Sequence, residues 1–320
     1  MRIFIQSPNI NSRHGGIRVI NEWANRLKDF GHEVILYNQR GPLVCDWMKL
    51  NCKIVNTPAM MLKSDCLIIT SPQGAYLLDK DKPIKKFVFL QMLEHLFNPM
   101  NNRMFNDCMM LYKTKYPLIS ISQWNIRLLQ NKFGRTGITK YVGNGVNLDD
   151  FPISNKPKDG KVILLESPEP TNMSKDVDKI AIKVAIMLKE QGYIIKGYGL
   201  KPAKDNIYSE YIIKPDLDTL NRLYEEATIM IKATKYDARS TAPLEAMTKG
   251  TVTVRGIIEG DDDLNEDNSF RCGYDFNELY LTTKKALTTD LTQKRENCIQ
   301  YVQQYSWDYW MEKINTIING

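Results

Sequence analysis

The sequence lacks any apolar run approaching the roughly 18 residues that a membrane-spanning helix needs. It also lacks a signal-peptide core at its start, because the apolar stretch in residues 1–5 is too short for one and instead predicts a first buried strand. We therefore expect a cytoplasmic protein with no transmembrane segment. Peripheral attachment to a membrane surface stays open.

Cysteine pairs and low-complexity segments are missing as well. None of the cysteines forms a C-x-x-C motif or a paired spacing, which favours buried free thiols over disulfides or a metal site. The six are Cys45, Cys52, Cys66, Cys108, Cys272 and Cys298. A hydrophobic fraction of 43% over 320 residues is enough for two ordinary globular domains.

Charge is unevenly distributed along the chain. Residues 1–153 carry 20 Lys and Arg against 11 Asp and Glu, a net charge of +9. Residues 154–320 carry 23 against 26, a net charge of −3. The basic first half suggests an anionic partner there, with ordinary scatter of surface charge as the alternative.

Strands and helices alternate in the first half. Short apolar runs predict strands at residues 3–5, 34–37, 66–69, 87–90, 118–121 and 141–142. Helical spacing of apolar residues starts at Ile17 and ends before Gly31, and a second helix is expected over residues 123–133, capped by Ser122 and ended by Gly134. This pattern is a βα alternation.

The alternation restarts after a segment with linker composition, residues 152–160, which contains Pro152, Pro157 and Gly160. Strands are predicted at residues 161–165, 193–195, 228–231 and 251–254, with helices at residues 177–188 and 217–224. A further helix is predicted with Pro243 in its first turn and Gly250 at its end. We therefore predict an α/β protein with two Rossmann-like doubly wound domains facing a central cleft. The first comprises residues 1–153 with a C-terminal helix at 306–320, and the second residues 154–305.

Two loops suit an anionic or hydroxylated ligand. Gly15 and Gly16 lie between the first strand and first helix, where open backbone amides favour an anion, although a plain turn is the alternative. In residues 236–250, Asp237 and Glu245 flank a loop of small residues. Carboxylates there suit the vicinal hydroxyls of a sugar or ribose. We expect Glu245 in the first turn of a helix, so that stabilising the helix start is its alternative role.

Residues 237–254 resemble the E-x7-E motif of family-4 glycosyltransferases of the GT-B fold, with Asp237 in place of the first Glu and a closely similar PLEAMTKGTVTV after it. Three further segments are similar to other parts of that family: the glycine loop and helix at 15–34, YVGNGVNLDDF at 141–151 and YSWDYWMEKI at 305–314. FVFLQMLEHLFNP at 87–99 resembles a segment of rhamnosyltransferase-like members, with Gln91 and Glu94 at matching positions.

The resemblance implies roles for individual residues. Asp237 would bind hydroxyls of the donor sugar and Glu245 the nucleotide ribose. The backbone of the loop that includes Arg239, Ser240 and Thr241 would meet the diphosphate. Gly15 and Gly16 would approach the diphosphate from the other domain.

The family has an Arg and a Lys after the first strand of the second domain, and this sequence departs from that pattern. Lys175 remains as a phosphate-binding candidate, with an ordinary surface lysine as its alternative. Glu166 stands where the Arg would be, and Arg239 is a candidate to compensate.

Glu94 and His95 follow a predicted strand and are the candidates for contact with the acceptor hydroxyl, with a structural role as the alternative. Residues 261–263 form an acidic Asp run, which we interpret as a solvated loop and not a metal site. No metal and no cofactor beyond the donor is expected.

The resulting expectation is a metal-independent transferase that moves a hexosyl or pentosyl group from a nucleotide-diphosphate sugar, such as a UDP-sugar, to an acceptor hydroxyl. A glycan or lipid-linked glycan is the favoured acceptor. A modified base in DNA is the alternative, which would require the base to leave the stack. A degenerate protein that binds the donor without turnover is a further alternative.

Overall fold

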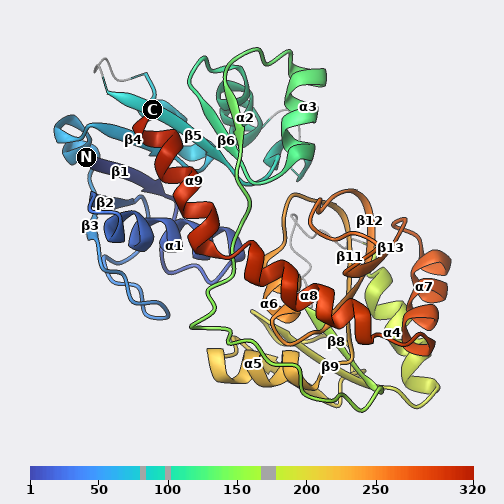
Figure 1. Ribbon diagram of the computed structural model, residues 1–320. Helices are drawn as coiled ribbons and strands as arrows, with labels where there is room; N and C mark the ends of the chain where they lie inside the picture. Colours follow the sequence, from blue (N-terminus) through green and yellow to red (C-terminus); the bar gives the residue numbers. More distant parts are fainter. Residues whose placement is uncertain (80–83, 98–101, 167–177) are drawn as a thin grey trace. The chain divides into compact units, whose positions relative to one another are not determined.

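The computed structural model describes residues 1–79, 84–97, 102–166 and 178–320 (Figure 1). The chain divides into two compact units. The first consists of Met1–Asn144 together with Asp308–Gly320, and the second is Gly145–Trp307. No helix in the described ranges combines the length and apolar character needed to cross a bilayer.

The first unit contains, within its described residues, a seven-stranded parallel sheet in the order β3-β2-β1-β4-β5-β6-β7. Its strands are β1 (Arg2–Ser7), β2 (Glu33–Asn38), β3 (Lys53–Val55), β4 (Cys66–Ile69), β5 (Lys85–Leu90), β6 (Leu118–Ser120) and β7 (Thr139–Tyr141). Its helices are α1 (Gly15–Asp29), α2 (Arg103–Lys113), α3 (Gln123–Phe133) and α9 (Trp307–Asn319), with short 3₁₀ turns η1 (Pro58–Lys63), η2 (Pro72–Leu77) and η3 (Glu94–Phe97).

The predicted signals at α3 are confirmed. The Ser122 hydroxyl accepts a hydrogen bond from the Trp124 amide, and Gly134 ends the helix in the left-handed conformation at φ 61°. A side-chain cap satisfies one of the amides that the first helical turn leaves open. Local sequence therefore sets both ends of this helix.

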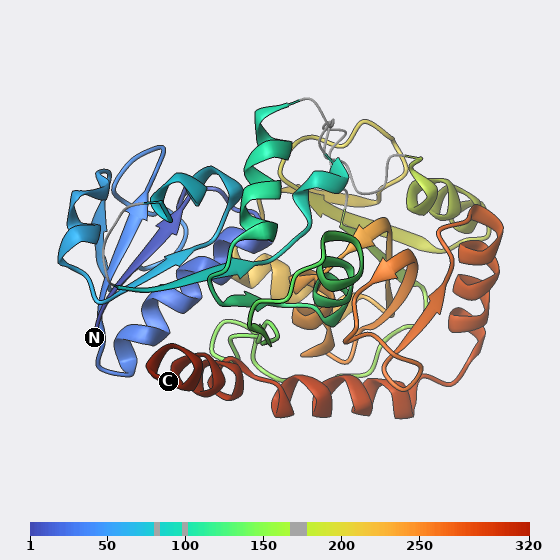
Figure 2. The same ribbon diagram turned by 90° about the horizontal axis from the view of Figure 1, so that it is seen from above.

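The C-terminal helix α9 returns to the first unit and lies beside α1 (Figure 2). Arg26 of α1 pairs with Asp308 at 2.7 Å, and the Nε2 of His32 lies 2.7 Å from the Asn315 side-chain oxygen. The apolar face of α9 is buried, with Trp310 3% exposed and Ile314 not exposed at all. Most of the segment YSWDYWMEKI is therefore part of an amphipathic helix that packs through its apolar face.

The second unit contains a six-stranded parallel sheet, counted over its described residues, in the order β10-β9-β8-β11-β12-β13. The strands are β8 (Val162–Glu166), β9 (Ile194–Gly199), β10 (Glu210–Ile213), β11 (Ile229–Asp237), β12 (Val252–Gly260) and β13 (Ser269–Cys272). The helices are α4 (Ile180–Glu190), α5 (Leu217–Glu226), α6 (Thr241–Met247), α7 (Phe276–Thr288) and α8 (Thr292–Gln304).

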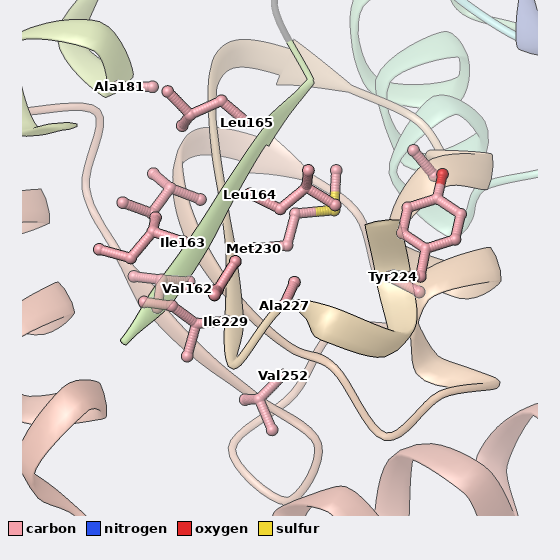
Figure 3. Close-up of a cluster of buried hydrophobic side chains, with 14 of the residues drawn as sticks. Val162, Ile163, Leu164, Leu165, Ala181, Tyr224, Ala227, Ile229, Met230 and Val252 are labelled. Carbon is pink, nitrogen blue, oxygen red and sulfur yellow. The ribbon is translucent and has the colours of Figure 1, made fainter. Parts of the chain in front are cut away.

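The core of the second unit is built on β8 and β11. Figure 3 shows Ile163 and Leu164 pointing to opposite sides of β8, with Met230 of β11 beside them and the ring of Tyr224 at one side of the cluster. Both faces of the strand are buried, which is why the sequence shows a continuous apolar run and not an alternating pattern. This rigid base supports the loops that follow the strands.

Residues 152–160, expected as a linker, are held to the second unit. The Ser154 amide donates to the Thr248 carbonyl at 2.9 Å. The Lys158 ammonium donates to the carbonyls of Tyr224 and Glu225 and to the Thr251 hydroxyl, at 3.0, 2.8 and 3.0 Å. The boundary between the units lies earlier, at Asn144.

Both sheets reverse their strand order once. In the first unit the reversal falls between β1 and β4, and in the second between β8 and β11. The predicted doubly wound α/β architecture is therefore confirmed in each unit. In such sheets, ligands bind beyond the carboxyl ends of the strands at the point of reversal.

Candidate functional site

Charged side chains gather at the reversal point of the second sheet. Glu166 is the last residue of β8 and Asp237 the last of β11, and these two strands are hydrogen-bonded neighbours. Their carboxylates therefore lie at the carboxyl edge of the sheet, where this fold type binds its ligands. We take this edge as the candidate site.

Asp237 is 3% exposed and its carboxylate is held from several directions. The Ser240 hydroxyl and the Arg255 guanidinium both contact Oδ2, the latter with Nη2 at 3.3 Å. The Ala238 amide donates to Oδ1 at 3.1 Å. A carboxylate fixed in this way accepts hydrogen bonds from a defined direction.

The loop after Asp237 is built against the acidic run at residues 261–263. The Asp261 carboxylate accepts a hydrogen bond from the Ser240 amide at 3.0 Å, and the Asp261 amide donates to the Asp237 carbonyl at 3.1 Å. Gly260 has φ +111°, and a Cβ there would overlap the Asp237 carbonyl oxygen. The two loops therefore approach more closely than any side chain at residue 260 would allow.

The interpretation of this acidic run as a solvated loop is correct for Asp262, which is exposed, and wrong for Asp261 and Asp263. Asp261 is 2% exposed and Asp263 6% exposed, because each pairs with a buried arginine. Asp261 Oδ2 lies 2.6 Å from Arg255 Nε, and Asp263 pairs with Arg239. Burial raises the pKa of Asp263 to about 6, although Arg239 and the Tyr301 hydroxyl act in the opposite direction.

Arg239 points into this network and not into solvent. Its side chain is 1% exposed, pairs with Asp263 and donates to the Tyr301 hydroxyl at 3.4 Å. A phosphate contact by Arg239 therefore requires its guanidinium to leave Asp263.

Ser240 and Thr241 begin the helix α6. Ser240 is the residue before the helix, and Thr241 is its first residue. The predicted first-turn position of Pro243 is confirmed, since it is the third residue of the helix. The first-turn position expected for Glu245 is wrong, because it is the fifth residue and α6 has no acidic residue in its first turn.

Glu245 therefore has a different role from stabilising the helix start. It is 8% exposed, and its Oε2 accepts a hydrogen bond from the Tyr224 hydroxyl at 3.0 Å. The Tyr224 hydroxyl also lies 2.7 Å from that of Tyr198. Burial, followed by the neighbouring Tyr198 and Glu245, raises the pKa of Tyr224 well above its ordinary value, so the phenol stays protonated as a donor.

A cation from β11 stands beside Glu166. The Lys232 ammonium bonds the Glu166 carboxylate, and the Lys232 side chain is 13% exposed. Burial acts to lower the pKa of Lys232, but the carboxylates of Glu166 and Asp237 outweigh it and the pKa is raised. Lys175, the phosphate-binding candidate, lies outside the described residues.

The charges of this cluster show what ligand it suits. The cluster contains three carboxylates, those of Glu166, Asp237 and Asp261. Two cations, Lys232 and Arg255, oppose them. The charges of Arg239 and Asp263 cancel each other. A cluster with more carboxylates than cations is poorly suited to a diphosphate. It suits hydroxyl groups, which donate to carboxylates.

The first unit brings its own candidates together. α1 begins at Gly15, and the Gly16 carbonyl accepts a hydrogen bond from the Gln91 side chain at 3.0 Å. A Cβ at Gly16 would lie 3.3 Å from the Gln91 side-chain oxygen. The glycine loop therefore packs on the segment after β5, which also contains Glu94 and His95.

Glu94 and His95 have different surroundings. Burial raises the pKa of Glu94 to about 7, and its Oε2 atom is shielded from solvent. His95 packs edge-on against Phe105, Tyr112 and Phe133, and its Nδ1 lies 3.1 Å from the Tyr112 hydroxyl. Burial, with Lys132 nearby, lowers the pKa of His95 to about 4, so its ring is neutral at pH 7. Of the two, Glu94 is the group whose pKa lies near 7, and His95 packs among aromatic side chains.

Two lysines of the basic first half, Lys85 and Lys86, donate to backbone carbonyls of the first unit. Lys86 is 7% exposed and its ammonium donates to the Leu78 carbonyl at 2.8 Å. Lys85 donates to the Asn319 carbonyl at 2.7 Å. Lys86 is therefore turned into the first unit, whereas Lys85 is exposed and its ammonium lies at the end of α9.

Sequence reasoning missed four residues of the second unit: Lys232, Arg255, Asp261 and Tyr224. Lys232 and Arg255 interrupt the apolar strands IMIKATKY and TVTVRGII. A charged residue inside a buried strand needs a partner, so this interruption was the available signal. Tyr224 and Asp261 carried no such signal. Among the described residues, no group of three or more His, Cys, Asp or Glu is placed to hold a metal ion.

No protein-family model and no curated protein sequence matches the chain. Solved structures do match over its length. Sucrose-phosphate synthase from Thermosynechococcus elongatus has a TM-score of 0.79 at 14% identity and covers 99% of this chain and 98% of its own. WaaG, a glycosyltransferase involved in lipopolysaccharide biosynthesis, has a TM-score of 0.73 at 15% identity, covering 99% and 100%.

A third similar structure is an alpha-glucosyltransferase in complex with UDP-glucose and DNA containing an abasic site. Its TM-score is 0.67 at 16% identity, with 100% of both chains covered. At such low identities the likeness shows the fold. The chain has the GT-B fold, with two Rossmann-like doubly wound units.

Proposed function

We propose that this chain is a glycosyltransferase that moves a sugar from a nucleotide-diphosphate sugar to an acceptor hydroxyl. The observation that carries the proposal is the placement of Asp237 and Glu245. Both are buried carboxylates at or just after the carboxyl end of β11, beside the reversal point of the second sheet. In a GT-B fold this is where a donor with ribose and sugar hydroxyls would bind.

The donor roles follow from the chemistry of each group. Asp237 accepts hydrogen bonds from hydroxyls of the transferred sugar, and Glu245 accepts them from the ribose. The backbone of residues 238–241 approaches the diphosphate, and the Ala238 and Ser240 amides would have to leave the Asp237 and Asp261 carboxylates to donate to it. Because carboxylates are in excess nearby, the negative charge of the diphosphate needs a further cation. Lys175 would supply it, or Arg239 after its guanidinium leaves Asp263.

The acceptor side belongs to the first unit. Glu94, with a pKa near 7, accepts the proton of the acceptor hydroxyl as it attacks. His95 holds the aromatic packing behind it. The amides at Gly15 and Gly16 form a second anion-binding position at the start of α1. Transfer without a metal ion is part of the proposal.

Two acceptor classes are supported by similar structures. WaaG acts in lipopolysaccharide biosynthesis, which accords with a lipid-linked glycan and with the rhamnosyltransferase-like segment at 87–99. The alpha-glucosyltransferase with bound DNA matches the full chain, which favours a modified DNA base as the second candidate. Membership of family 4 and a cytoplasmic location, including at a membrane surface, stay part of the proposal.

A thermal-shift screen of nucleotide sugars tests the donor assignment first. A ligand that binds only the folded state stabilises that state and so raises the melting temperature. At a free ligand concentration of about 100 Kd the stabilisation is about 2.7 kcal/mol. UDP-sugars are the first to test, since UDP-glucose occupies a similar structure. Slow hydrolysis of the best ligand then separates a transferase from a protein that binds the donor without turnover. A panel with no stabilising nucleotide sugar would refute the proposal.

A further inference from the structure

Arg255 is a charged residue in the buried part of strand β12, where apolar residues are usual. It is the fourth residue of β12, and its side chain has no exposed surface. A buried guanidinium is strongly unfavourable unless its donors are paired. Its partners therefore show what the charge is for.

The Arg255 guanidinium joins two carboxylates from different loops. Its Nε lies 2.6 Å from Asp261 Oδ2, and its Nη2 lies 3.3 Å from Asp237 Oδ2. Nη2 also donates to the Thr234 hydroxyl at 2.7 Å and Nη1 to the Lys232 carbonyl at 3.2 Å. The planar fork of an arginine holds several acceptors in fixed directions, whereas a lysine offers one point of charge on a flexible stem.

Asp261 extends this contact to the loop that starts α6. It adopts the left-handed conformation with φ 51°, which is uncommon for a residue with a side chain. In this conformation Oδ2 is within ion-pair distance of Arg255 and Oδ1 accepts a hydrogen bond from the Ser240 amide at 3.0 Å. Arg255, Asp261 and the loop from Asp237 to Ser240 therefore form one continuous set of contacts.

We propose that Arg255 and Asp261 are positioning residues that fix the Asp237 carboxylate, together with the loop that follows it, in the geometry that receives the transferred sugar. This inference rests on the proposed function, in which Asp237 contacts the transferred sugar. Buried ion pairs add little net stability compared with apolar groups of the same volume. What the pair supplies is a fixed orientation, which catalysis requires before the substrate arrives.

Two variants perturb the pair without removing its volume. Arg255→Lys keeps the charge and loses the fork. Asp261→Asn keeps an oxygen for the Ser240 amide and loses the charge facing Arg255. Arg135→Lys is the matched control, because Arg135 is also buried and paired with carbonyls, those of Tyr112, Thr114 and Tyr116, but lies in the first unit.

The first measurement is independent of catalysis. Hydrogen exchange of the Ser240 amide should speed up on the order of tenfold in both variants, the middle of the range for coupled groups in contact. Exchange in the β8 core should stay at the wild-type rate, and Arg135→Lys should leave the Ser240 amide unchanged. Wild-type exchange at Ser240 in both variants would overturn the proposal.

The second measurement uses UDP and UDP-glucose. Arg255→Lys should lower kcat for UDP-glucose hydrolysis on the order of tenfold, with little change in KM and in calorimetric UDP affinity. In the Asp237→Asn background the same substitution should have almost no further effect, because its action passes through Asp237. Additive losses, or equal losses of kcat and UDP affinity, would mean a structural role only.

The experiments distinguish an error in the positioning role of Arg255 and Asp261 from an error in the proposed glycosyltransferase function. If the wild type neither binds UDP nor hydrolyses UDP-glucose or other nucleotide sugars, the proposed function falls, and exchange at Ser240 still decides whether the pair positions the loop. If the wild type is active and Arg255→Lys matches it in kcat, positioning is wrong. If Arg255→Lys does not fold, Asp261→Asn decides.

Discussion

Replacing Glu94 by glutamine should stabilise the protein at alkaline pH while removing its activity. Burial raises the pKa of this carboxyl from an ordinary value of 4.5 to about 7. The folded state therefore holds a proton that the unfolded state has lost, and wild-type stability falls as pH rises between these two values. Above pH 7 the protein carries the full cost of an ionised, buried carboxylate.

The size of this cost follows from the shift. At about 1.4 kcal/mol per pKa unit it amounts to ~3 kcal/mol. Glutamine occupies the same volume and does not ionise, so the variant avoids the cost. In a unit of this size ~3 kcal/mol corresponds to roughly 6–12 °C in melting temperature.

The assay is thermal unfolding of wild type and Glu94→Gln from pH 4.5 to 8.5, with transfer or donor hydrolysis measured in parallel. The two proteins should melt together near pH 4.5 and diverge as pH rises, with the variant higher. Wild-type activity should increase with pH through about 7, and the variant should lack that increase. The exposed Glu33 provides the control, and Glu33→Gln should follow the wild-type stability profile. A constant gap between wild type and Glu94→Gln at all pH values would refute the reasoning.

Three further substitutions test other parts of the account. His95→Phe should keep turnover, because the histidine ring is neutral and packs among aromatic side chains. The free energy of unfolding should drop by about 1–3 kcal/mol, because the Tyr112 hydroxyl loses its partner. A loss of turnover in folded protein would restore His95 as a catalytic candidate. Tyr224→Phe removes the donor to Glu245 and should weaken UDP binding by about five- to tenfold in calorimetry, since a net hydrogen bond is worth about 1 kcal/mol; unchanged affinity would separate Tyr224 from the site. Burial lowers the pKa of Lys158 from 10.5 to about 7 in the folded protein. The unfolded protein therefore binds more protons between pH 7 and about 10.5, and the free energy of unfolding should rise with pH across that window. Lys158→Met should abolish this rise, and a variant with the wild-type slope would contradict the prediction.

Much of the fold could be predicted from the sequence because its signals are local. Apolar runs located β1, β4 and β8, and Ser122 with Gly134 set the ends of α3. The helix α2 was not predicted, although Asn102 caps it, because its buried face is short and consists of Cys108, Leu111 and Tyr112. The short edge strands β3 and β13 also lacked a clear apolar run.

The site was predictable where one segment carried it and not where distant segments met. Asp237 and Glu245 lie in a single motif, so the sequence located both. The partners that hold Asp237 come from β12 and the loop after it, and only the folded sheet brings them within 3.3 Å. The same reason explains the error at Asp261 and Asp263, since a run of carboxylates looks solvated until the arginines opposite it are known.

Asp237 and Glu245 are proposed to bind a nucleotide-sugar donor, and calorimetric titration of three proteins decides this assignment. The wild type, Glu245→Gln and Asp237→Asn are titrated with UDP, or with the nucleoside diphosphate of the best ligand in the screen. Losing charge-assisted hydrogen bonds to the ribose costs about 1.5–3 kcal/mol, so Glu245→Gln should bind roughly ten- to 150-fold more weakly. Asp237→Asn should bind nearly as well as wild type, because the bare diphosphate lacks the sugar. If folded Glu245→Gln binds as tightly as wild type, the donor assignment is contradicted.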